Sequence, residues 1–117
     1  MKNNKIYNLE ERTANFGESV IDLCKNIKQD VITRSIINQL IKSSTSIGAN
    51  YMEANSASSK KDFRNKIFIC KKEAQETKHW LRMILKCIPE SKERVNILSQ
   101  ECQELILIFG KILSSLR

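Results

Sequence analysis

Apolar and small residues recur at alternating spacings of three and four in four separate stretches of this sequence. Such spacing places them along one side of an α-helix and is typical of helices that pack side by side in a bundle. Four stretches in one short chain therefore predict four helices around a single core. The predicted core residues are Leu9, Thr13, Phe16, Val20, Leu23 and Ile27; Ile37, Leu40, Ser44, Ile47, Tyr51 and Ala54; Phe63, Ile67, Cys70, Ala74, Thr77, Leu81 and Ile84; and Val95, Leu98, Cys102, Leu105, Phe109, Ile112 and Leu116.

The breaks between these stretches carry residues that start or end helices. Asp30 and Thr33 are both candidate N-caps, since their side-chain oxygens can accept hydrogen bonds from first-turn N–H groups. Ser59 and Asp62 resemble a capping box, and Pro89 cannot continue a helix interior. We therefore predict helices over residues 8–28, 33–55, 60–87 and 91–116.

The short connections favour antiparallel neighbours, so the predicted fold is an all-α, up-down-up-down four-helix bundle. The 117 residues fit one domain over residues 1–117. One proline and three glycines are too few for a β-sandwich or barrel, which needs a turn about every 8–12 residues.

The composition gives no sign of export, membrane insertion or metal binding. Residues 1–5 are polar and lack the apolar segment of a secretory signal. The longest apolar run, residues 105–109, is far shorter than the roughly 20 residues of a membrane span. The four cysteines lie far apart and His79 is the only histidine, whereas structural zinc sites use closely spaced cysteines and histidines. We expect a cytoplasmic protein with reduced cysteines, no metal and no cofactor.

The net charge of +7 is concentrated in one segment. Residues 60–86 carry nine basic and three acidic side chains, whereas residues 1–30 and 87–117 are each neutral. At about 100° per residue, six of these cations fall on one flank of the predicted helix. We call this set the basic stripe: Lys60, Arg64, Lys71, Lys78, Arg82 and Lys86. A row of cations attracts phosphates and releases counterions on contact, and nearby Phe68 and His79 can stack on an unpaired base. The alternative is a solvated face that only keeps the protein soluble.

Two of the predicted helices carry more apolar residues than one core requires. Residues 106–108 make the last helix apolar all round over more than a turn, and Phe68, Ile69 and Trp80 lie away from the core of the third. Scattered exposed apolar residues are normal in soluble proteins. Their clustering on two neighbouring helices nevertheless favours a subunit interface.

A second row on the helix over residues 33–55 is small and polar, and ends in Asn50 and Glu53. Small residues let another helix approach closely, and Asn50 and Glu53 can form hydrogen bonds across a helix or subunit contact. A serine nucleophile would need a base and a Gly-flanked turn, which the serines of this row lack. No catalytic set of carboxylates, His, Cys or phosphate-binding loop can be assembled. We therefore predict that the protein is not an enzyme.

Two stretches of the sequence resemble a known family. Residues 43–54, SSTSIGANYMEA, are similar to the signature of the four helix bundle protein family, also called 23S rRNA intervening-sequence proteins. Residues 72–81, KEAQETKHWL, resemble the second conserved stretch of that family, and the likeness extends over essentially the whole chain. Met52 departs from the arginine that many members carry at this position.

The resemblance implies a bacterial protein with the antiparallel bundle fold that assembles as a ring-like homopentamer. The family is similar to the accessory variability protein of diversity-generating retroelements, a basic pentamer that binds nucleic acid and a reverse transcriptase. Glu76 and Trp80 lie in the second stretch, and we assign them, with Asn50 and Glu53, to structural or interface positions.

Two functions remain open from the sequence. The first is a non-catalytic, oligomeric accessory protein that binds RNA or DNA through the basic stripe. The alternative is a protein-interaction scaffold that docks an acidic protein partner and has no direct role in nucleic-acid binding.

Overall fold

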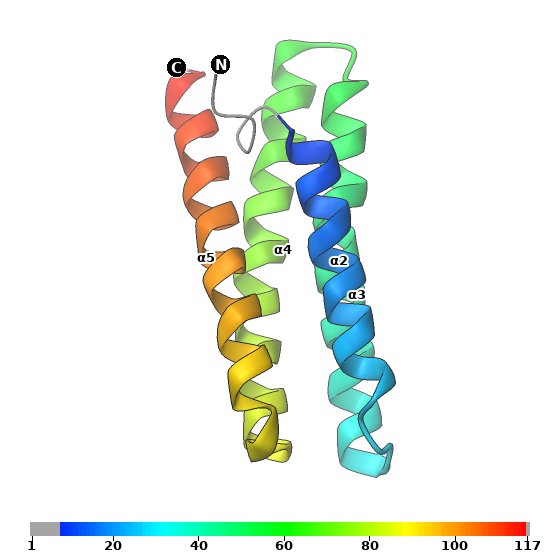
Figure 1. Ribbon diagram of the computed structural model, residues 1–117. Helices are drawn as coiled ribbons and strands as arrows, with labels where there is room; N and C mark the ends of the chain where they lie inside the picture. The colour runs from blue at the N-terminus through cyan, green and yellow to red at the C-terminus, as the bar shows by residue number, and fades with distance from the viewer. Residues whose placement is uncertain (1–7, 117) are drawn as a thin grey trace.

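The computed structural model describes residues 8–116; residues 1–7 and 117 of the predicted domain lie outside the described residues. The helices are α2 (Leu9–Lys25), α3 (Val31–Asn55), α4 (Lys60–Cys87) and α5 (Lys92–Ser115), and the 3₁₀ turn η1 (Pro89–Ser91) precedes α5. The helices run alternately in opposite directions, so that the start of α2 and the end of α5 lie at the same end (Figure 1). No strand occurs between residues 8 and 116. The predicted all-α four-helix fold is confirmed.

Local hydrogen bonds explain where α3 and α4 begin. Asp30 rather than Thr33 is the N-cap of α3: its Oδ1 accepts from the backbone N–H groups of Ile32 and Thr33 at 2.9 and 2.8 Å. Thr33 Oγ1 in turn accepts from the backbone N–H of Asp30 at 2.9 Å. This capping box starts the helix two residues earlier than predicted. Ser59 Oγ accepts from the N–H of Asp62 at 3.0 Å, and α4 begins directly after Ser59, as predicted.

The end of α2 differs from the prediction. The N–H groups of Asn26 and Ile27 bond to the carbonyls of Leu23 and Cys24, three residues back. The chain therefore leaves the α-helical pattern after Lys25 and closes with a tighter turn. Ile27 is still buried, which is why its spacing suggested a longer helix.

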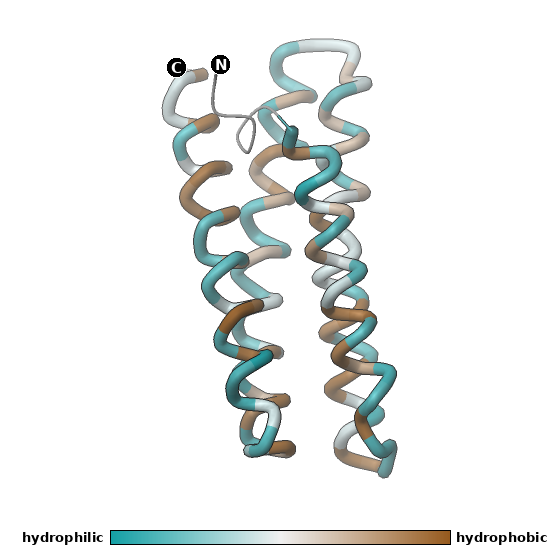
Figure 2. The backbone as a smooth tube through the Cα atoms, in the orientation of Figure 1, coloured by the Kyte–Doolittle hydropathy of each residue, from teal (hydrophilic) through white to brown (hydrophobic). Residues whose placement is uncertain are grey.

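The core is built mainly from the residues that the spacing predicted. Every predicted residue is buried except for four that are half-buried, namely Tyr51, Phe63, Ile112 and Leu116. Cys24, Thr33, Ser43 and Ile106 are buried as well. Figure 2 shows apolar and polar bands alternating along each helix, as expected for helices that bury one side. Burial of this apolar surface stabilises the bundle and fixes the rotation of each helix about its axis.

A close approach of α2 and α3 depends on one glycine. A Cβ atom on Gly48 would lie 3.2 Å from Thr13 Oγ1. Thr13 is buried and its hydroxyl donates to the Leu9 carbonyl at 2.7 Å, so that it has little freedom to move aside. At Gly17, across the same contact, a Cβ would meet ordinary distances of 3.7 Å. Gly48 is therefore the position that sets how closely these helices pack.

Candidate nucleic-acid interface

Helix α4 lies between α3 and α5 and has extensive contacts with both. On the α3 side, Lys66 Nζ lies 2.7 Å from Glu53 Oε1. On the α5 side, Lys78 Nζ donates a hydrogen bond to Gln103 Oε1 at 2.7 Å. The basic stripe thus lies on the flank of α4 that turns toward α5, and the surface between the two flanks faces solvent.

The structure divides the six residues of the basic stripe into two groups. Lys60, Arg64, Arg82 and Lys86 are exposed. Lys71 and Lys78 are half-buried against α5, and Lys78 is held by Gln103.

Lys71 lies beside Gly110 of α5. The Lys71 Nζ lies 3.8 Å from the place where a Cβ of Gly110 would be, which is an ordinary contact distance. The lysine therefore lies against the surface of α5. The inner part of the predicted stripe therefore contributes to packing between α4 and α5, and its outer part stays free.

Two further cations, Lys61 and Lys72, are exposed on the solvent side of α4. Each of them directly follows a stripe residue in the sequence, Lys61 after Lys60 and Lys72 after Lys71. A prediction that allowed a slightly wider angular range around the helix would have included them. Together with the free part of the stripe they form a surface that we call the basic face. Its members are Lys60, Lys61, Arg64, Lys72, Arg82 and Lys86.

The acidic residues of α4 lie on the flank toward α3. Glu73 and Glu76 line a hollow of about 200 Å³ together with Gln39, Lys42 and Ser43 of α3. Burial, and then the neighbouring carboxylate of Glu76, raise the pKa of Glu73 above its ordinary value. Lys72 of the basic face and Lys42 of α3 partly offset this rise. The acidic flank therefore borders the basic face at Lys72, while its carboxylates line the hollow toward α3.

Two carboxylates of α5 are also engaged elsewhere. Arg12 of α2 reaches Glu101 through Nε at 2.7 Å and Glu104 through Nη2 at 2.7 Å. These bonds, with Glu101 first, raise the pKa of the Arg12 guanidinium, which stays charged. They connect α2 and α5, which contact each other less than the other neighbouring helices do, and they hold these acids on the side of α5 toward α2.

The four residues assigned to structural or interface positions have different surroundings. Glu53 bridges α3 and α4 through its ion pair with Lys66, as its spacing suggested. Asn50 forms its bond within its own helix: its Nδ2 donates to the Ser46 carbonyl at 2.8 Å. A bond from Asn50 across a subunit contact stays a prediction. Glu76 is exposed. Trp80 is half-buried against the core and meets His79 edge-on, with ring centroids 4.8 Å apart.

Most of the apolar surplus on α4 and α5 packs within this one chain. Ile106 is buried, Ile108 packs against the core, and Ile69 is half-buried. The exposed members of the surplus are Phe68 and Leu107, with 59% and 62% of their surface accessible. The sequence of α5 is apolar on more than one side because the helix contacts both α4 and α2.

The cysteines that lie in the core are held as neutral thiols. Cys70 Sγ donates to the Ile47 carbonyl at 3.5 Å and Cys102 Sγ to the Ala74 carbonyl at 3.0 Å. Burial raises the pKa of Cys70 and Cys102 to about 12 and that of Cys24 to about 11. Among residues 8–116, no group of three or more His, Cys, Asp or Glu side chains is arranged to hold a metal ion.

These thiols should differ sharply in reactivity toward a disulfide reagent such as DTNB. At pH 8 we expect half-buried Cys87 to react first, while Cys24, Cys70 and Cys102 react only as fast as the protein opens. Their raised pKa values stabilise the fold below pH 9, and this contribution is lost as the pH rises toward 12. Labelling in denaturant gives the total of four thiols, and three or four rapid reactions in the native state would contradict the buried positions.

A further hollow lies between α2 and α3. It has a volume of about 500 Å³ and a floor of small residues that includes Ala14, Gly17 and Gly48. Glu10, Glu11 and Glu18 are among its lining residues. Within residues 8–116, the lining of this hollow includes no basic side chain, His or Cys.

The family model for the 23S rRNA-intervening sequence protein matches residues 3–111. The chain belongs to this family. A solved structure from Bacteroides thetaiotaomicron, described as a protein with unknown function from the S23 ribosomal protein family, is 30% identical to this intervening-sequence protein. The match covers 89% of this chain and 96% of the other, with a TM-score of 0.78. Comparison with curated proteins gives no match.

The family resemblance predicted from the two sequence stretches is thus confirmed. The relation to the accessory variability protein of retroelements stays a prediction. Within residues 8–116 of this intervening-sequence protein, the helices are too short or too polar for any of them to traverse a bilayer.

Proposed function

We propose that this intervening-sequence protein is a non-catalytic, oligomeric accessory protein that binds nucleic acid through the basic face. The observation that carries the proposal is the separation of charge on α4. Its free cations share the solvent side of the helix, whereas Glu73 and Glu76 lie toward α3 and Lys66 is paired with Glu53. A surface of this kind attracts a phosphate backbone without selecting a base sequence.

The dimensions of the basic face suit several phosphate contacts. Lys60 and Lys86 stand near the two ends of α4, and at about 1.5 Å per residue the row extends over roughly 39 Å. Lysine and arginine side chains that are free of protein partners can each approach a phosphate and release a counterion. Binding should therefore be steeply dependent on salt and weakly dependent on sequence.

The oligomeric part of the proposal has support from exposed apolar side chains. Leu107 and Met52 lie on the surface with more than half of their area accessible, and apolar surface of this kind favours contact between subunits. The family resemblance implies a homopentamer. In any oligomer the basic face is repeated, and several weak contacts then combine through avidity. Light scattering across a dilution series measures the mass of the particle.

Fluorescence anisotropy of labelled RNA and DNA, titrated with nuclease-treated protein over a salt series, tests nucleic-acid binding. If all six members of the basic face contact phosphates, we expect log K to fall with log[salt] with a slope of about −4 to −5. Absence of binding at low salt would overturn the proposal. The basic face would then be a docking surface for an acidic protein, and a pulldown from nuclease-treated cells would recover that partner.

A further inference from the structure

Phe68 is an exposed aromatic residue in the middle of the positive surface. Its side chain is 59% accessible, and it follows Arg64 by four residues and precedes Lys72 by four. Residues at this spacing share one face of a helix. Lys71 is about one turn away from Phe68 and Lys61 about two turns away, on the same side of the helix. The core of a protein–protein interface is depleted in charged residues, so four cations around one phenyl ring favour a ligand that carries both negative charge and a flat surface.

A hollow at the start of α4 has the character of a phosphate site. It measures about 300 Å³, and it is lined by Lys60, Lys61 and Arg64 of α4 together with Leu116, the C-cap of α5. Within residues 8–116, the lining includes no carboxylate. Since Arg64 borders this hollow and lies one turn from Phe68, the positive hollow and the exposed ring are neighbours on the same surface.

The arrangement of helices decides between paired and unpaired nucleic acid. A helix that reads a duplex enters the major groove, which is about 12 Å wide, close to the diameter of one helix with its side chains. Helix α4 packs against α3 on one side and α5 on the other along most of its length, and short connections join it to both (Figure 1). Because α3 and α5 run along both of its flanks, α4 cannot lie deep in the groove over its length. A duplex could contact the outer cations through its phosphates, but its stacked bases would remain out of reach of Phe68.

We infer that the basic face binds single-stranded nucleic acid, with an unpaired base stacked on Phe68 and an adjacent phosphate in the hollow of Lys60, Lys61 and Arg64. The inference rests on the proposed function and narrows its ligand. Stacking on an aromatic ring tolerates every base, because each base has a π-face. The site thus selects unpaired over paired strands, and it does not select a sequence.

The test compares Phe68→Leu and Phe68→Trp with the unchanged protein. Anisotropy titrations use a labelled single strand that forms no secondary structure and a blunt duplex of the same length. We expect Phe68→Leu to weaken single-strand binding by about 5- to 150-fold, the range for loss of one stacked base. Duplex binding and the salt slope should stay unchanged, and Phe68→Trp should restore single-strand binding. Ile97→Ala, an exposed apolar truncation on α5, is the matched control and should alter neither titration.

The possible outcomes separate the inference from the function on which it rests. Absence of binding to both probes by the unchanged protein would overturn both. Equal loss of single-strand and duplex binding in Phe68→Leu, or no loss at all, would overturn the stacking site alone. A loss that accompanies a change in particle mass would also overturn it, because Phe68 would then belong to a contact between subunits.

Discussion

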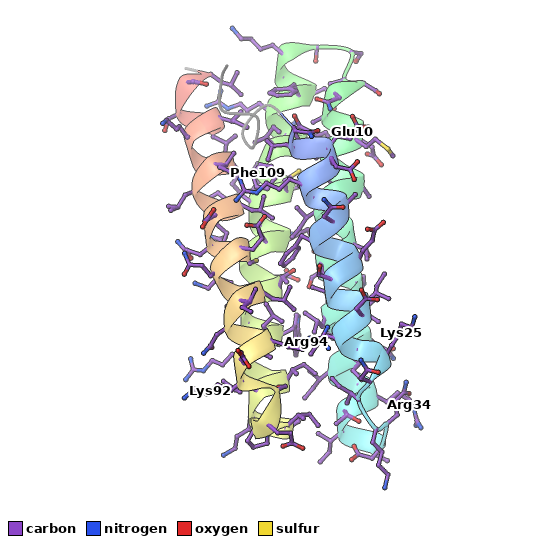
Figure 3. All side chains as sticks on the ribbon, viewed as in Figure 1. Glu10, Lys25, Arg34, Lys92, Arg94 and Phe109 are labelled. Carbon is purple, nitrogen blue, oxygen red and sulfur yellow. The ribbon has the colours of Figure 1, made fainter. Side chains whose placement is uncertain are left out.

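Phe109→Ala is expected to lower the free energy of unfolding by about 3–5 kcal/mol, the usual cost of truncating a large aromatic residue in a core. Phe109 is completely buried and is the largest of the fully buried side chains. It projects from α5 into the space between the helices (Figure 3) and faces Tyr51 of α3, with ring centroids 6.4 Å apart. The truncation leaves a cavity that regular helices on every side can fill only in part. The total free energy of unfolding of a domain of this size is about 5–15 kcal/mol.

Urea and thermal unfolding followed by circular dichroism measure this effect. A loss of that size corresponds to a decrease in melting temperature of roughly 10–20 °C for a chain of this length. Ile97→Ala on the same helix is the control: Ile97 is 64% accessible, and its truncation should change stability by no more than about 0.5 kcal/mol. Similar losses for both variants would show that α5 does not bury the side that the structure assigns to the core.

The sequence was sufficient to predict the helices and their inner sides. Burial of one apolar side per helix is a strong and periodic signal, so the positions from Leu9 to Phe109 followed from spacing alone. Helix ends were predicted less accurately because they depend on single hydrogen bonds. Asp30 and Thr33 both had the chemistry of an N-cap, and only the geometry of their reciprocal bonds shows which one begins α3.

The candidate site could be predicted only in part. Helical period places Lys71 and Lys78 on the same flank as Arg64, but it does not show which neighbouring helix lies beside that flank. Helix α5 decides the outcome, since Lys71 lies beside Gly110 and Lys78 donates a bond to Gln103. The same limit applies to Asn50, whose amide has a carbonyl of its own helix within reach. Pairings between distant segments depend on packing, which spacing does not encode.

Reversal of three free cations on the basic face should abolish most nucleic-acid binding. The variant combines Arg64→Glu, Lys72→Glu and Arg82→Glu, all at exposed positions. Loss of three phosphate contacts lowers affinity by roughly 10²- to 10³-fold at 0.1 M salt and reduces the steepness of the salt slope by about 2–3. Lys71 is left unchanged, because its position across Gly110 would confuse loss of binding with loss of packing.

A matched control separates the location of the charges from their number. Lys25, Arg34 and Arg94 are exposed on α2, α3 and α5, away from the basic face (Figure 3). Their reversal to glutamate changes the net charge by the same amount. If the basic face is the binding surface, the control triple should retain the salt slope of the unchanged protein and lose only the weak, screened attraction of distant charges. Circular dichroism should show the same helical content in all three proteins.

Comparison of the basic-face triple variant with the control triple variant decides how the protein recognises a polyanion. Equal losses would mean that total charge alone governs binding, as for a protein attracted through its overall field. No loss in the basic-face triple would place the contact elsewhere and leave α4 as a solvated surface. A large loss confined to that triple would require phosphates to lie along the solvent side of α4. The slope that remains would then estimate how many contacts Lys60, Lys61 and Lys86 still provide.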